Sequence, residues 1–193
     1  LCVVGNDSRQ AAGQTAGTSN TREETLTAAD GWPIHATYYE SAAGKESPVV
    51  ILLAAAEGPD KKDARNRRVW QNTALALQKS GFAVIAVDLR KHGDSKPENT
   101  GPDSPLLKMA PGDYLVMANL DMDAVKAFLL SEHHNEKLNI RKTGIVAVGS
   151  SAMVAAASAV ADWAQKPYPD GPTLESSTPR GQDVRALILY SPN

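Results

Sequence analysis

GIVAVGSSAMVAAASAV, residues 144 to 160, is the stretch that decides the fold of this chain. A continuous apolar run ends at Gly149, two serines follow, and a run of small apolar residues begins at Ala152. The first run has the length and composition of a strand buried on both faces, and the second is long enough for a helix. The stretch therefore predicts a buried strand, a sharp turn around Ser151 and a helix from Ala152 to Ala164.

The same alternation recurs along the chain. Three more continuous apolar runs have the length of strands, at residues 48–54, 82–89 and 184–190. Helical patterns separate them. Trp70, Ala74 and Leu77 share one helical face, and another is formed by Val116, Leu120, Ala124 and Phe128. Buried strands that alternate with helices predict an α/β fold, with a mainly parallel twisted sheet, right-handed crossovers and helices on both faces.

A different pattern precedes the first buried strand. Residues 24 to 40, ETLTAADGWPIHATYYE, contain two strand-like segments joined at Asp30-Gly31, a dipeptide suited to a tight hairpin turn. In such a hairpin Leu26, Ile34, Ala36 and Tyr38 would share one face. The sequence thus predicts an antiparallel hairpin that leads into the parallel sheet.

The length and composition of the chain predict one folded domain. The 193 residues are 42% hydrophobic and 22% charged, which is ordinary for a globular protein. Residues 6–22 are small and polar without an apolar period, so residues 1–22 are expected to be a disordered lead or the remnant of a signal peptide, and 23–193 the domain. The apolar start at Leu1 is consistent with export and equally with an arbitrary start, so the localisation stays open.

Charge and hydropathy exclude several classes of function. The formal net charge of −2 and a pI near 6.1 give no electrostatic reason to expect nucleic acid as a partner. The basic run at residues 61–68 is interspersed with aspartate and is expected to be a solvated helix start. No stretch approaches the roughly 18 to 20 apolar residues of a membrane helix, so no membrane span is expected.

No metal or cofactor is predicted. His133 and His134 are adjacent and would point to different faces of a helix, without a second cluster of ligands. Gly44-Lys45-Glu46-Ser47 lacks the spacing of a phosphate-binding loop, and no G-x-G-x-x-G follows a strand. A lone Cys2 can form neither an intrachain disulfide nor a cysteine-based zinc site.

Four features together resemble the α/β-hydrolase family, over about residues 23–193. Gly149 to Met153 follow the G-x-S-x-G pattern of its nucleophile turn up to the last position. The leading hairpin, the strand at 48–54 with a glycine-containing loop after it, and FAVIAVDLRKHGDS at 82–95 agree with the same family.

The resemblance implies a serine ester or acyl hydrolase. Ser151 would be the nucleophile, and the backbone N–H groups of Ala152 and Ala56 would stabilise the oxyanion of the reaction. The substrate would be a small molecule or an acyl compound, and no cofactor would be needed.

Several residues depart from the family pattern. Met153 replaces the last glycine of the motif, Lys91 a common glycine, and Ala54 to Gly58 the usual His-Gly start of the oxyanion loop. No histidine follows Ser151, and the distance of His92, two strands away in the family order, disfavours it as a substitute base.

We therefore expect a hydrolase-like domain that is incomplete at its carboxyl end and inactive as this chain. It would become a serine hydrolase only if an acid and a histidine lie beyond Asn193. The alternative is a non-catalytic binding or structural domain. The last strand, residues 184–190, would be an open edge through which the chain self-associates.

Overall fold

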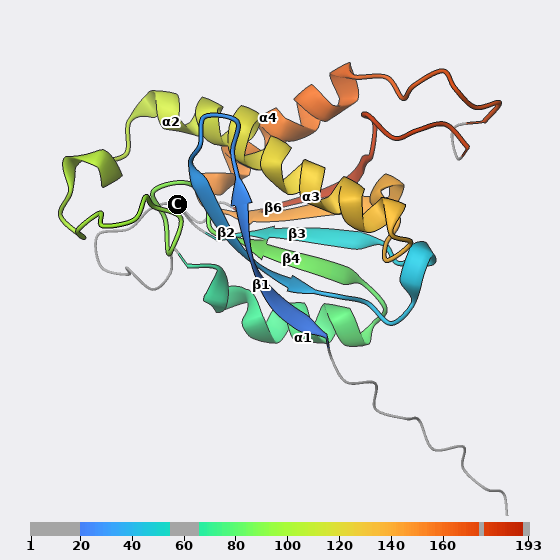
Figure 1. The fold of residues 1–193 in the computed structure, drawn as a ribbon, viewed down its shortest axis with the longest axis horizontal. Helices are drawn as coiled ribbons and strands as arrows, with labels where there is room; N and C mark the ends of the chain where they lie inside the picture. Colours follow the sequence, from blue (N-terminus) through green and yellow to red (C-terminus); the bar gives the residue numbers. More distant parts are fainter. Residues whose placement is uncertain (1–19, 55–65, 174–175, 191–193) are drawn as a thin grey trace, which may run out of the picture.

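A six-stranded sheet forms the centre of the protein (Figure 1). The computed structural model describes residues 20–54, 66–173 and 176–190. Along the sheet the strands follow the order β1-β2-β4-β3-β5-β6. Their bounds are β1 (Thr21–Thr27), β2 (Pro33–Tyr39), β3 (Val49–Leu53), β4 (Ala83–Val87), β5 (Thr143–Val148) and β6 (Val184–Tyr190). All four apolar runs and both segments of the hairpin are therefore strands, as predicted.

The pairing directions also agree with the prediction. β1 pairs with β2, and β2 with β4, in antiparallel orientation, whereas β4, β3, β5 and β6 are mutually parallel. Gly31 in the hairpin turn has a φ of +83°, a conformation that glycine adopts without steric cost. β1 begins two residues before the predicted domain start.

Helices cover both faces of the sheet (Figure 1). One face packs against α1 (Gln71–Lys79), and the other against α2 (Pro111–Val116), α3 (Met122–His134) and α4 (Ser151–Ala164). A π-helical turn, η5 (Met117–Asp121), joins α2 to α3. The described residues also contain short 3₁₀ turns: η1 (Gly44–Glu46), η3 (Arg67–Trp70), η4 (Pro105–Leu107) and η6 (Ile140–Lys142). None of the described helices has the length and apolar character needed to cross a bilayer.

The two cores explain why the strands are apolar without alternation. Ile51 and Ile85 contribute to the core beneath α3 and α4, while Val50 and Val84, one residue away, contribute to the core against α1. Successive side chains of a strand point to opposite faces, so a sheet covered on both sides requires apolar residues at every position.

The helix predicted from Val116 to Phe128 is interrupted, and its buried face differs from the prediction. Met117, Val125 and Leu129 are among the buried residues, whereas Phe128 lies at the margin of the core. The π-helical turn inserts one extra residue, which rotates the following helix relative to a regular α-helical pattern. It also places Asp121, which has no exposed surface, against Arg90: the backbone N of Arg90 lies 2.8 Å and its Nε 2.7 Å from the carboxylate.

The prediction of a solvated basic run is wrong for Arg67, which is 4% exposed. Its guanidinium forms ion pairs with Asp88, with Asp94 at 2.9 Å and with Glu23 at 2.6 Å. The backbone N of Arg67 also donates to Asp88, at 2.5 Å. These contacts join the start of η3 to the end of β4 and to β1, which the sequence spacing did not reveal.

Steric demands around Asp88 constrain the backbone of the segment after β4. A Cβ added at Gly93 would lie 2.1 Å from the Asp88 carboxylate, so only glycine fits there. Lys91, which stands in place of a common glycine of the family, has a φ of +66°. Its ammonium lies 2.7 Å from Asp113 and 3.0 Å from the Lys108 carbonyl. These contacts offset the cost of the left-handed backbone.

We predict that Arg67→Ala lowers the free energy of unfolding by about 3–5 kcal/mol, because it leaves Asp88 buried without its counter-ion. The neighbouring Arg68→Ala serves as the matched control. Arg68 is exposed and pairs only with Asp94 among the described residues, so its loss should cost less than about 1 kcal/mol. Urea unfolding measures both; equal losses would contradict the analysis.

We predict that Lys91→Gly is more stable than Lys91→Met by about 1 kcal/mol, because both lose the ion pair but only glycine relieves the left-handed backbone. Thermal unfolding of the two variants measures the difference. A methionine variant as stable as the glycine variant would show that the backbone at position 91 is unstrained.

Candidate active site

The predicted strand, turn and helix around Ser151 are present. β5 ends at Val148, Gly149 has a φ of +63°, and α4 begins at Ser151. Ser150 between them has right-handed helical backbone angles, φ −65° and ψ −20°. The left-handed residue of the turn is therefore Gly149, two positions before the predicted nucleophile.

The hydroxyl of Ser151 is directed into the protein. Ser151 has no exposed surface, and its Oγ accepts a hydrogen bond from the Val148 N at 3.1 Å. The same oxygen lies 2.7 Å from the Val148 carbonyl and 3.4 Å from the Leu53 carbonyl, to either of which it can donate. The side chain thus ties the first turn of α4 to the ends of β5 and β3.

Of the two predicted oxyanion donors, the structure describes only Ala152. The N–H of Ala152 donates to the Gly149 carbonyl at 3.0 Å, so in this arrangement it closes the turn. Ala56 lies outside the described residues. Met153, at the position of the last motif glycine, is 56% exposed, so its bulk points away from the packed interior.

Ser150 is the residue of the turn that the motif analysis did not single out. It is 7% exposed, and its buried Oγ has no hydrogen-bond partner among the described residues. A buried hydroxyl without a partner is unusual in a folded protein. The motif gave no signal for it, because Ser150 occupies a position at which any residue is allowed.

No described hydrogen bond of Ser151 involves a histidine. His92 is buried, with Nδ1 2.7 Å from the Arg90 carbonyl, and it follows β4, which β3 separates from β5. His35 lies in the hairpin, with Nδ1 3.2 Å from the hydroxyl of Thr25. Asp88, at the end of the strand that precedes His92, is buried, and this burial raises the pKa of its carboxyl group. Hydrogen bonds that it accepts from the backbone and from Arg67 act in the opposite direction. The described hydrogen bonds therefore do not join His92 to Ser151.

An apolar hollow lies beside the start of α4. It has a volume of about 580 Å³ and is lined by residues of α2 and α4 and of the segment before α2, among them Tyr114, Leu115 and Met153. Near the turn the structure therefore offers an apolar surface. Among the described residues no group of three histidine, cysteine, aspartate or glutamate side chains could hold a metal ion.

Comparisons with known proteins give matches among solved structures only. No protein-family model matches the sequence, and no curated protein matches it. DcsB, solved with a substrate analogue, is 18% identical over 73% of this chain and 42% of its own, with a TM-score of 0.54. The α/β-hydrolase GrgF from Penicillium sp. sh18 is 19% identical over 72% and 41%, with a TM-score of 0.53.

An esterase from Exiguobacterium antarcticum is 21% identical over 86% of this chain and 43% of its own, with a TM-score of 0.50. This chain therefore spans about two fifths of the length of these structures. At such identities the likeness concerns the fold. Together with the mixed sheet and the strand, turn and helix around Ser151, it shows that this chain has the α/β-hydrolase fold.

Proposed function

We propose that this chain is an α/β-hydrolase-like protein of serine ester or acyl hydrolase ancestry in which Ser151 has a structural role, so that the chain itself does not hydrolyse esters. The observation that carries the proposal is the Ser151 hydroxyl, buried and hydrogen-bonded to Val148 and within reach of the Leu53 carbonyl. The presence of hydrolases among the similar folds supports the ancestry.

The chemistry of a serine nucleophile supports the same conclusion. A serine hydroxyl becomes reactive when a base within hydrogen-bond reach takes its proton. The described partners of Ser151 are backbone groups, which cannot serve as that base. The N–H of Ala152 is also engaged with Gly149, so a developing oxyanion would compete with an existing hydrogen bond.

The apolar hollow beside Met153 favours the second candidate, a non-catalytic binding domain. Its lining of aromatic, aliphatic and thioether side chains suits an apolar group such as an acyl chain. In this alternative the fold would retain a ligand without cleaving it.

We predict that Ser151→Ala lowers the free energy of unfolding by about 1–3 kcal/mol, because the backbone N–H of Val148 loses its hydrogen-bond partner. Ser150→Ala is the matched control in the same turn. Since the Ser150 hydroxyl has no described partner, its removal should leave stability unchanged or raise it. Urea unfolding measures both variants.

Labelling with a fluorophosphonate probe separates the structural role from catalysis. The proposal predicts that the folded chain is not labelled. The opposite result would be that the wild-type chain is labelled, that Ser151→Ala abolishes the labelling, and that this variant is as stable as the wild type. That result would identify Ser151 as an activated nucleophile and overturn the proposal.

We also propose that the chain self-associates through β6. Among the described strands β6 pairs only with β5, and its residues Leu187 to Tyr190 are 40–62% exposed. An exposed apolar edge strand is a template for pairing with another chain.

We predict that the apparent mass in size-exclusion chromatography rises with concentration, and that Ile188→Lys reduces this rise because a charge at the edge opposes pairing. Thr25→Lys on β1, the opposite edge strand, is the control and should leave the association unchanged. A wild-type chain that stays monomeric at all concentrations would contradict the prediction.

A further inference from the structure

The open edge of β6 presents a regular row of backbone groups. The Tyr190 carbonyl accepts a hydrogen bond from the Gly149 N–H at 2.7 Å, so Tyr190 directs its backbone groups toward β5. Backbone groups of successive residues in a strand point to alternate edges. Leu187 and Leu189 therefore direct their N–H and C=O groups to the open edge, where no described strand pairs with them. Such groups are a template for a further strand.

Both faces of this edge carry exposed apolar side chains. Leu187 lies opposite Ile145, a residue of the core beneath α3 and α4, and Ile188 lies opposite Val146, at the margin of the core against α1. Since side chains alternate between the faces of a strand, Leu187 points to the α4 face and Ile188 to the opposite face. The side chains of residues 187–190 are 40–62% exposed. A strand that covers this edge must therefore bring apolar side chains to both faces.

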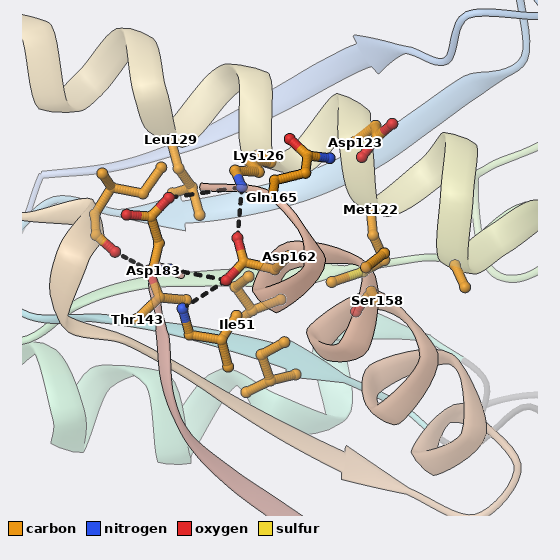
Figure 2. A pocket seen from close by; sticks show the side chains of 15 residues that line it. Ile51, Met122, Asp123, Lys126, Leu129, Thr143, Ser158, Asp162, Gln165 and Asp183 are labelled. Carbon is orange, nitrogen blue, oxygen red and sulfur yellow. Dashed lines mark hydrogen bonds and ion pairs between the residues drawn. The ribbon is translucent and has the colours of Figure 1, made fainter. Parts of the chain in front are cut away.

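The end of α4 holds the start of β6 in place. The Asp162 carboxylate accepts hydrogen bonds from the backbone N of Asp183 at 2.8 Å and of Val184 at 3.0 Å, and Figure 2 shows it beside Asp183. Trp163 Nε1 donates to the Val184 carbonyl at 2.8 Å. α4 and β6 together line a hollow of about 470 Å³, with Val160, Trp163 and Leu187 among its apolar residues. The edge is therefore a preformed strand with an apolar wall beside it.

The other described edge of the sheet does not match this surface. β1 has the sequence TREETLT, so it would bring Arg22, Glu23 and Glu24 against the leucines of β6. Charged side chains on an edge strand oppose pairing with an apolar one. β6 itself carries a single charge, on Arg185, between apolar neighbours. Of the two described edges, β6 of a second copy is therefore the better match for β6.

We propose that two copies of the chain pair β6 with β6, in antiparallel orientation, about a two-fold axis at Leu187. This dimer rests on the self-association proposed above, to which it adds an orientation and a register. The pairing joins two six-stranded sheets into one. Because both copies use the same edge, the contact closes at a dimer, whereas pairing between unlike edges would continue into an open chain of molecules.

The register follows from the length and the side chains of β6. With the axis at Leu187 all seven residues of each strand are paired, whereas a shift of the axis to Ile188 leaves out the first two. Leu187 then faces its own copy on the α4 face. On the other face Ile188 lies opposite Ala186, and Tyr190 opposite Val184, so large side chains pack against small ones. The single arginine of β6 faces a leucine rather than its own copy.

Disulfide crosslinking tests the register. Cys2 is the only cysteine of the chain, so all variants carry Cys2→Ser. Leu187→Cys should form a disulfide-linked dimer with oxidised glutathione, because opposite residues of a hydrogen-bonded antiparallel pair have Cα atoms about 5.5 Å apart, within disulfide range. Leu189→Cys, on the same edge and face, is the matched control. Its two copies would lie about 14 Å apart along the strands, so it should crosslink at least about tenfold less. Non-reducing electrophoresis measures both variants.

A mixture of two variants provides a second test, which stays decisive if Leu187→Cys does not fold. Arg185→Cys and Leu189→Cys lie opposite each other in the proposed pair. Their equimolar mixture should therefore form the disulfide-linked dimer, whereas Arg185→Cys alone should not.

The other outcomes overturn the proposed pairing. Equal crosslinking of Leu187→Cys and Leu189→Cys would indicate parallel strands. Species larger than a dimer in size-exclusion chromatography would show that β6 pairs with an unlike edge. If the chain self-associates but neither Leu187→Cys nor the mixture crosslinks, the two-fold pairing is wrong and the self-association stands. A chain that stays monomeric at all concentrations would overturn both.

Discussion

The hydroxyl of Ser151 is the interaction on which the architecture around the turn depends. It accepts the backbone N–H of Val148 and lies within hydrogen-bond reach of the carbonyls of Val148 and Leu53, so one side chain connects β5, β3 and the start of α4. These hydrogen bonds stabilise the Ser151 hydroxyl in its buried position. The hydroxyl would have to break them before it could react. The position that the sequence pattern predicted for a nucleophile is thereby compatible with a purely structural role.

Ionic contacts of two arginines connect the segments that surround the end of β4. Arg67 connects the segment before α1 to Asp88 at the end of β4, and Arg90 connects the hairpin turn, through Asp30 at 2.7 Å, to Asp121 in the π-helical turn. Both arginines are nearly buried, and so are two of the carboxylates they compensate, Asp88 and Asp121, which would be costly without them. The hydrogen bond from Arg90 lowers the pKa of Asp30, which keeps that carboxylate charged.

The two ends of α4 therefore differ in chemistry. At its start the hydroxyl of Ser151 and the backbone of the turn satisfy one another, whereas near its end Asp162 and Asp183 share one lysine. The first arrangement is closed to a ligand and the second has unmet hydrogen-bonding capacity.

The sequence by itself determined the strands, the hairpin and the strand, turn and helix around Ser151, because burial on two faces and a tight turn each impose a local pattern of residues. It also identified Lys91 as a residue that stands at a common glycine position of the family pattern. Only the tertiary structure decided the burial of Arg67, the π-helical turn at Asp121 and the direction of the Ser151 hydroxyl. Each of these depends on which group, distant in the sequence, lies within a few ångströms of a side chain. Such proximity produces no periodic pattern of residues in the sequence.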